Sequence, residues 1–176
     1  VISSNALTGI TTRMADAGMS AGSILQVVQT VKTDFFSTTS SNGTYVDITG
    51  LTASITPSSS SNKILVMVSI TGGSTNWANQ YQLLRGSTVL GLGDDIGSNR
   101  SRSTFSSHNA VEATDSTNTS SYTYLDSPSS TSSTTYKIQL SHRSSGTAWI
   151  NRPSNTADYD WIFSGSSTIT LQEVAV

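Results

Sequence analysis

The stretch KILVMVSI, residues Lys63–Ile70, says more about the fold of this chain than any other segment. Successive side chains of a strand point to opposite faces of a sheet, and here both faces are apolar. In a two-sheet sandwich, such a strand needs cover on its second side as well as on its first. We expect a subunit interface to supply that cover, with four candidate contacts: Ile64, Val66, Val68 and Ile70.

Short apolar runs, separated by clusters of Ser, Thr, Asn and Gly, continue on both sides of this stretch. The run Tyr136–Ser141 alternates cleanly: Tyr136, Ile138 and Leu140 should face inward, and Lys137, Gln139 and Ser141 should face water. No helical pattern separates the runs, which favours antiparallel pairing. The sequence therefore predicts an all-β domain over residues 23–176, an antiparallel β-sandwich or jelly roll. Further strands are expected near residues 23–31, 44–49, 52–56, 80–85, 88–92, 109–114, 121–125, 147–151, 159–163 and 167–175.

Residues 1–22 have a different character, because small residues and glycines dominate them and no strand alternation persists. We interpret this segment as an N-terminal arm or linker, either a short helix or an extended chain. Its aliphatic positions Ile2, Leu7, Ile10 and Met14 recur at roughly helical spacing, so one face could pack on a neighbouring chain.

The composition excludes several classes of function. Charged residues make up only 11% of the chain, while Ser and Thr make up about a third, so hydroxyl groups must keep the surface soluble. A net charge of -2 with nine basic residues leaves little to neutralise phosphates, which argues against nucleic acid as a partner. The absence of cysteine excludes disulfides and thiolate chemistry. No apolar stretch is long enough to cross a bilayer, so we expect no membrane insertion.

Exposed aromatic residues are the best candidates for ligand contact, since sugar rings stack on flat apolar faces. Trp77 follows the loop-like run GGSTN and is the first candidate, whereas the other tryptophans are expected in the core. Tyr122, Tyr124 and Tyr159 are further glycan candidates, because Ser, Thr and Asn surround them and could bind sugar hydroxyls.

Metal binding and catalysis have weaker support. The pairs Asp94-Asp95 and Asp158/Asp160 could hold calcium or magnesium, but their spacing matches no known ion-binding loop and solvated turns explain them equally well. His108 and His142 have no second ligand at metal-binding spacing. We therefore expect no metal and no cofactor.

A hydrolase is the alternative from another class of function. Ser20 stands in the run GMSAG, which has the spelling of a nucleophile elbow but not the preceding strand and following helix that the elbow requires. A glycosidase would need two carboxylates at a defined separation, drawn from Asp94, Asp95, Glu112 and Asp115. We favour a protein without catalytic residues.

Four segments carry a resemblance to a known group of proteins. They are GSILQVV at Gly22–Val28, ITPS at Ile55–Ser58 leading into KILV at Lys63–Val66, LLRGS at Leu83–Ser87, and STITLQE at Ser167–Glu173. From about Gly22 to Val176 the chain resembles the C-terminal domains of bacteriophage tail and head fibres and capsid decoration proteins, particularly those of marine phages.

The resemblance implies a homotrimer of jelly rolls with a shape like that of tumour necrosis factor, exposed on the virion surface. It also implies that residues 1–22 join a fibre shaft or capsid. The expected function is a fibre or spike head that displays loops to a host-surface glycan. A capsid decoration protein that reinforces the shell is the alternative.

Overall fold

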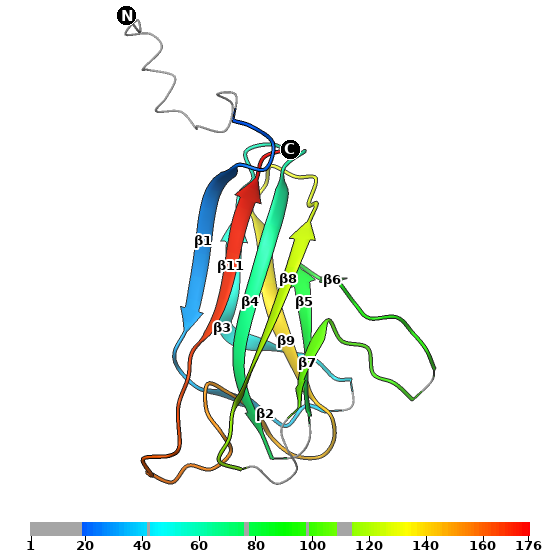
Figure 1. Cartoon of the computed structure of the whole chain (residues 1–176). Coiled ribbons are helices and arrows are strands. Elements are labelled where there is room, and N and C mark those ends of the chain that lie inside the picture. The colour runs from blue at the N-terminus through cyan, green and yellow to red at the C-terminus, as the bar shows by residue number, and fades with distance from the viewer. Residues whose placement is uncertain (1–18, 42, 76–77, 98, 109–113) are drawn as a thin grey trace, which may run out of the picture.

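The structure, a computed structural model, describes residues 19–41, 43–75, 78–97, 99–108 and 114–176. These residues form two antiparallel sheets packed face to face, and none of them is helical (Figure 1). The described residues therefore include no helix that could span a membrane. This confirms the predicted all-β antiparallel sandwich. The arm predicted over residues 1–22 lies outside the described residues up to Gly18.

The larger sheet, called sheet A, contains six strands. Its long strands follow the order β1-β11-β4, with β8 pairing the other side of β4. Two short strands, β10 and β2, extend the sheet beyond the end of β11. The strand bounds are β1 Ile24–Lys32, β2 Phe36–Thr38, β4 Lys63–Ser74, β8 Asn118–Asp126, β10 Ala148–Ile150 and β11 Ser167–Val174.

The smaller sheet, called sheet B, contains five strands in the order β3-β9-β5, after which β6 and β7 pair different parts of β5. Strand β6 pairs with Leu83–Arg85, and β7 pairs with Ala78–Tyr81. The strand bounds are β3 Val46–Ile55, β5 Ala78–Arg85, β6 Thr88–Leu90, β7 Phe105–His108 and β9 Thr134–His142.

The order of the main strands is that of a jelly roll. Along the chain these strands are β1, β3, β4, β5, β7, β8, β9 and β11, and the chain changes sheet at every step except from β5 to β7. Sheet A then reads β1-β11-β4-β8 and sheet B reads β3-β9-β5-β7. This arrangement of two interleaved Greek keys is the jelly-roll arrangement.

Strand β4 lies in the middle of sheet A, with β11 and β8 on its two sides. Ile64, Val66, Val68 and Ile70 are at most 3% exposed and form part of the core between the sheets. They cannot touch a second copy of the folded chain, so their prediction as subunit contacts is corrected. The side chains that β4 turns to the opposite face are Leu65, Met67 and Ser69, which are only half-buried.

Strand β9 follows its predicted alternation for most of its length. Tyr136, Ile138 and Leu140 are fully buried, while Lys137 and Gln139 remain partly exposed. The pattern ends at Ser141 and His142, which are both fully buried. Ser141 was expected to face water, and its burial is a correction: the segment after β2 reaches this end of β9, where the carbonyl of Ser40 accepts from the amide of His142 at 2.8 Å.

Two other expectations change, one strand appears that was not expected, and one expected strand lies almost wholly outside the described residues. The strands expected at 44–49 and 52–56 are one strand, β3, whose pairing with β9 shifts register between Asp47 and Thr52 around Gly50, at φ +82°. The segment 159–163 is a loop instead of a strand, and β2 is an unpredicted strand. Residues 109–113 of the strand expected at 109–114 lie outside the described residues, and the nearest strand is β7.

The first and last described strands meet at one end of the sandwich, which we call the base. The amide of Gly22 donates to the carbonyl of Ala175 at 2.8 Å, and the amide of Ala175 donates to the carbonyl of Ser23 at 2.9 Å. The opposite end, which we call the tip, carries the β1–β2 and β10–β11 loops (Figure 1). The paired ends of β1 and β11 and the longest loop of the described residues, β10–β11, therefore lie at opposite ends of the sandwich.

Candidate functional site

The β10–β11 loop at the tip is tied to the sandwich at its start and its end by Asn151. This residue adopts φ +68°, and its Nδ2 donates to the carbonyls of Lys32 (2.8 Å) and Asp34 (2.9 Å). Its Oδ1 accepts a hydrogen bond from Ser167 Oγ at 2.6 Å. Its carbonyl accepts from the amide of Gly165 at 2.9 Å, which closes the loop. The residues between these anchors, 152–164, we call the tip loop.

The tip loop exposes three large aromatic side chains. Tyr159 and Trp161 stack with their ring centroids 4.5 Å apart and their planes 12° apart, and they are 50% and 57% exposed. Phe163 is more exposed still. Exposed rings of this size are costly to hydrate, and their flat faces suit the apolar faces of sugar rings. We call the stacked pair of Tyr159 and Trp161 the aromatic platform.

A shallow groove of about 210 Å³ runs beside the platform and combines apolar with polar groups. Arg152 contributes a guanidinium that lies 3.9 Å from the centroid of the Trp149 ring and 5.5 Å from that of Phe35. Such cation–π contacts fix the direction of the guanidinium without neutralising its charge. Asp158 on the same groove adds a carboxylate, so the groove offers both donors and acceptors to a polyhydroxylated ligand.

Of the predicted glycan candidates, Tyr159 is the one that the structure places on this exposed loop. Tyr122 and Tyr124 lie on β8 instead, half-buried against the core, and their rings stack 6.4 Å apart. The stack continues through Phe105 to the fully buried Tyr81. Burial raises the pKa of Tyr122 above its ordinary value. These two tyrosines fill the open edge of the sandwich, so their main role is packing.

The tryptophans also differ from expectation. Trp77 lies outside the described residues, so its predicted role stays a prediction. Trp161 was expected in the core but is more than half exposed. Trp149 is half-buried and carries Arg152 on its face. The signal for Trp161 was local: acidic residues on both sides of Tyr159 interrupt any apolar run in the segment ADYDWIF.

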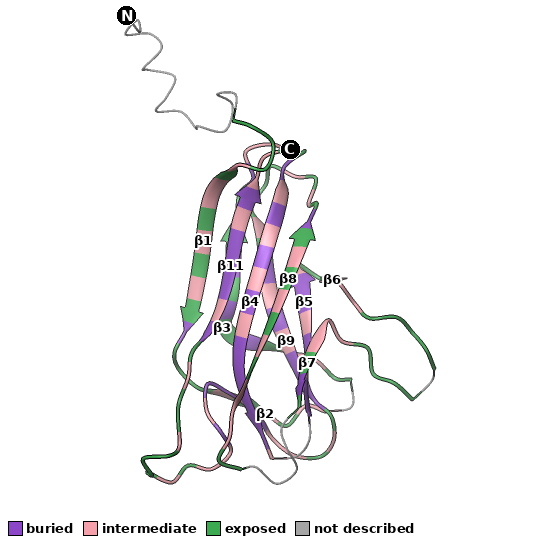
Figure 2. Ribbon diagram, viewed as in Figure 1, coloured by how far each residue is buried: buried purple, intermediate pink, exposed green. Residues whose placement is uncertain are grey.

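The outer face of sheet A is a second candidate surface. Strand register places Val27, Gln172, Leu65 and Leu125 in one row across β1, β11, β4 and β8. Val27 and Leu125 are about half exposed, as is Val31 two rows further along. Figure 2 shows exposed residues recurring along β1 and β8 on this face. The second row holds Gln29, Thr170, Met67 and Thr123, and the third holds Val31, Thr168, Ser69 and Ser121.

No charged residue occurs in these three rows of described residues, which we call the uncharged face. Depletion of charge is the compositional mark of the buried centre of protein interfaces. Large contiguous apolar patches can mark surfaces that bind another protein, whereas apolar side chains scattered singly do not. The uncharged face can therefore be buried against another protein without leaving a charged side chain buried and unpaired.

The residues considered for metal binding and catalysis do not come together. Among the described residues, no group of three or more His, Asp or Glu side chains is placed to hold a metal ion. Asp94 and Asp95 lie on the exposed β6–β7 loop, where Asp94 Oδ1 accepts from the amide of Asp95 at 2.8 Å. Asp158 and Asp160 lie exposed on the tip loop.

The hydrolase candidates are equally scattered. Ser20 is exposed in the turn before β1, and a strand follows it where a nucleophile elbow has a helix. Asp115 accepts a hydrogen bond from Asn155 at 2.7 Å, while Glu112 lies outside the described residues. His142 is fully buried with its Nδ1 against the carbonyl of Ser144 at 2.7 Å, and His108 is exposed at the end of β7.

Neither the models of known protein families nor the curated proteins contain a match to this sequence. The functional argument therefore rests on the fold and on the surfaces described above.

Proposed function

We propose that this chain is a non-enzymatic virion structural protein, the head of a homotrimeric fibre or spike that attaches to a glycan on the host surface. The observation that carries the proposal is that the two ends of the sandwich differ. The connection to the rest of the chain lies at the base, and the exposed aromatic platform lies at the tip. An attachment head needs this arrangement, because its receptor site must point away from its anchor. Jelly rolls are also frequent among viral capsid and lectin domains.

The uncharged face supports the trimer. It is a broad sheet surface, whereas the β8 edge, where the half-buried rings of Tyr122 and Tyr124 lie, is narrow. In the proposed trimer, the β8 edge of one copy packs on the uncharged face of the next. Contacts between two different patches form a ring when the rotation closes, and three copies keep every tip at the same end.

Light scattering coupled to size-exclusion chromatography tests the trimer. The expected mass is three times the 18.5 kDa of one chain at micromolar concentration. Met67→Glu would place a charge in the middle of the uncharged face and should release monomers. The control Gln82→Glu places the same charge on the outer face of sheet B and should leave the trimer intact. A wild-type protein that is a stable monomer would overturn the proposal.

Glycan recognition is tested on an array of immobilised oligosaccharides. Specific binding that is lost in Trp161→Ala, with unchanged thermal unfolding, would support the aromatic platform as the receptor site. Trp77→Ala tests the residue that the sequence favoured. If neither substitution changes binding, the platform is not the receptor site.

The alternative role is a capsid decoration protein that reinforces the shell. It requires the same trimer and base, and it requires no ligand at the tip. Immunogold labelling of intact particles separates the two roles: label confined to fibres supports attachment, and label spread over the shell supports decoration.

A further inference from the structure

We infer that a second pocket, on the outer face of sheet B, binds an acidic saccharide: a sugar residue that carries a carboxylate or a sulfate. The inference goes beyond the aromatic platform, because it uses different residues at a different place in the fold. It rests on the proposed function only for its biological setting, and the binding itself can be measured on the isolated protein.

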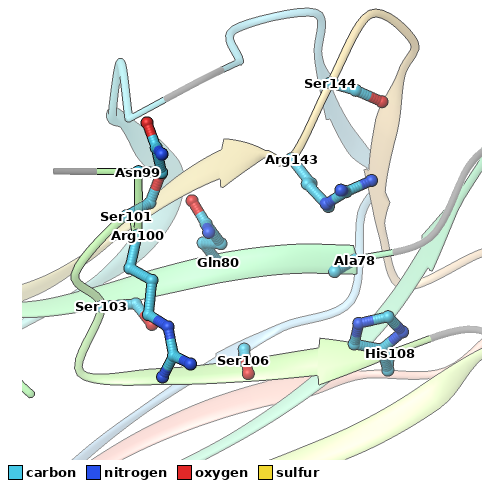
Figure 3. Close-up of a pocket in the computed structure, with 10 residues that line it drawn as sticks. All are labelled: Ala78, Gln80, Asn99, Arg100, Ser101, Ser103, Ser106, His108, Arg143 and Ser144. Carbon is cyan, nitrogen blue, oxygen red and sulfur yellow. The ribbon is translucent and has the colours of Figure 1, made fainter. Parts of the chain in front are cut away.

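The floor of this pocket is formed by the side chains that β5 and β7 turn away from the core. Gln80 pairs with Ser106 across the two strands, and Ala78 pairs with His108. The β6–β7 loop forms one wall with Arg100 and its neighbours, and Arg143 comes from the β9–β10 loop on the other side. Figure 3 shows Gln80 standing on β5 between the two arginines. The cavity encloses about 570 Å³, within the range of small-molecule sites.

The charged side chains in the described lining of this pocket are all basic. Two guanidinium groups and an imidazole line it, together with serine hydroxyls and two side-chain amides, and its described lining contains no carboxylate. Arg100 takes part in none of the ion pairs among the described residues, and its side chain descends across the pocket toward β7 (Figure 3). Guanidinium groups bind carboxylates and sulfates through paired hydrogen bonds, so the pocket is built for an anionic group.

A second observation points to a hydroxylated ligand. The Oε1 atom of Gln80 is buried and accepts no hydrogen bond from the described residues. A buried acceptor without a donor costs free energy, so a turn of the Gln80 side chain that brings Oε1 against a ligand hydroxyl in the pocket would be favoured. Ser103 and Ser106 offer further hydroxyls on the same floor and wall. A ligand that combines an anionic group with several hydroxyls matches this set, which is the chemistry of an acidic sugar.

Among the described residues, no Trp, Tyr or Phe side chain lines the pocket, so it lacks the broad apolar ring on which a neutral sugar would stack. Recognition must come from charge and hydrogen bonds. The pocket therefore differs from the aromatic platform in what it discriminates: the platform responds to ring shape, and the pocket responds to an anionic substituent. The charge also makes binding weaker as salt concentration rises.

The test is isothermal titration calorimetry on the full chain with four probes: three oligosaccharides of equal length, which are a galacturonate, a sulfated and a neutral one, and inorganic sulfate. Saturable binding of at least one acidic oligosaccharide is expected, with no binding of the neutral one. Whether the galacturonate or the sulfated probe binds more tightly identifies the anionic group. Arg100→Gln and Arg143→Gln should each weaken binding about tenfold or more, since each removes a charge-assisted contact.

The matched control is Arg102→Gln. Arg102 lies two residues from Arg100 on the same loop, but its Nε donates to the carbonyl of Gly93 at 2.7 Å and it does not line the pocket. Its loss changes the net charge equally and should leave affinity within twofold. The proposal is overturned if neither acidic oligosaccharide binds, if the neutral one binds as tightly, or if inorganic sulfate binds as tightly as the sulfated sugar. Trp161→Ala should leave this binding unchanged, so the proposal for the pocket and the proposal for the platform can each be refuted without the other.

Discussion

Glu173 is a buried carboxylate whose charge is held by hydrogen bonds alone, and its replacement by glutamine should destabilise the sandwich at neutral pH. The side chain is 1% exposed at the base, near the end of β11. Its Oε1 accepts from the amide and the hydroxyl of Ser58 and from Asn62 Nδ2, and its Oε2 accepts from Gln26 Nε2, all at 2.6 Å. Burial raises the pKa of this carboxyl, but the hydrogen bonds from Ser58, Asn62 and Gln26 together lower it by more than burial raises it. The pKa of Glu173 therefore lies below its ordinary value.

The magnitude follows from these four contacts. A charged acceptor adds about 1 kcal/mol to each hydrogen bond relative to a neutral one, or about 4 kcal/mol for the set. The cost of burying the charge offsets part of this gain. We therefore expect Glu173→Gln to lower the free energy of unfolding by about 2 kcal/mol at pH 7. For a chain of this size, that corresponds to a decrease in Tm of about 4–8 °C.

The dependence on pH gives this prediction its sharpest test. A carboxyl whose pKa is lowered by folding stabilises the native state above its unfolded pKa of about 4.3. That stabilisation is lost as the pH falls through the folded pKa. The difference in the free energy of unfolding between wild type and Glu173→Gln should therefore be largest at pH 7 and should become smaller toward pH 3. Urea denaturation at both pH values, at one fixed protein concentration, measures the gap.

The control for this experiment is Asp160→Asn, which removes an exposed carboxylate on the tip loop. It should leave stability unchanged within about 0.5 kcal/mol at either pH. A Glu173→Gln protein as stable as wild type at pH 7, or a gap of the same size at pH 3, would refute the reasoning.

Three further substitutions test the packing of the sandwich. Asp126→Asn should cost about 2 kcal/mol in urea denaturation, because the buried carboxylate accepts from both Tyr136 Oη at 2.6 Å and Arg85 Nη1 at 2.8 Å, and an amide has only one oxygen to face these two donors; equal stability would show that these contacts contribute nothing. Gly73→Ala should cost about 1–3 kcal/mol, since its Cβ would meet the backbone of the tip loop at 2.6 Å, whereas Gly93→Ala would gain only an ordinary contact at 3.5 Å and should be neutral. Asn151→Ala should speed amide hydrogen exchange in the tip loop far more than in β4; uniform acceleration would contradict its role as a local anchor.

Much of the fold could be predicted from local patterns. The alternation in β9 and the apolar run in β4 identify two central strands, one in each sheet, because burial of a strand leaves a periodic record in its sequence. The same pattern predicted that Ile64, Val66, Val68 and Ile70 are buried, but it could not decide whether the second sheet or another subunit covers them. Pairing decides that question, and pairing is not local: the uncharged face exists because β1, β11, β4 and β8, which are far apart in the sequence, align in register.

The tip loop shows why the candidate site was harder to predict. The segment ADYDWIF has the aromatic content of a strand, so a strand was expected at 159–163. The structure makes it a loop because Asn151 and Gly165 close the segment on itself beyond the end of the sheet. The pocket on sheet B is similar, since Gln80, Arg100 and Arg143 come from three separate segments and no short motif joins them.

The first and last residues of the tip loop are held together, so the sequence between them can be replaced. The bonds of Asn151 go to the sandwich or to the end of the loop itself, and Ser154 and Asn155 bond to Thr114 and Asp115, so residues 156–163 carry none of these anchors. A foreign sequence of similar length placed between these positions would inherit an anchored start and finish. Natural variation could thus change the side chains that this loop exposes while selection on the scaffold continues, and an engineer could use the same site for a peptide library.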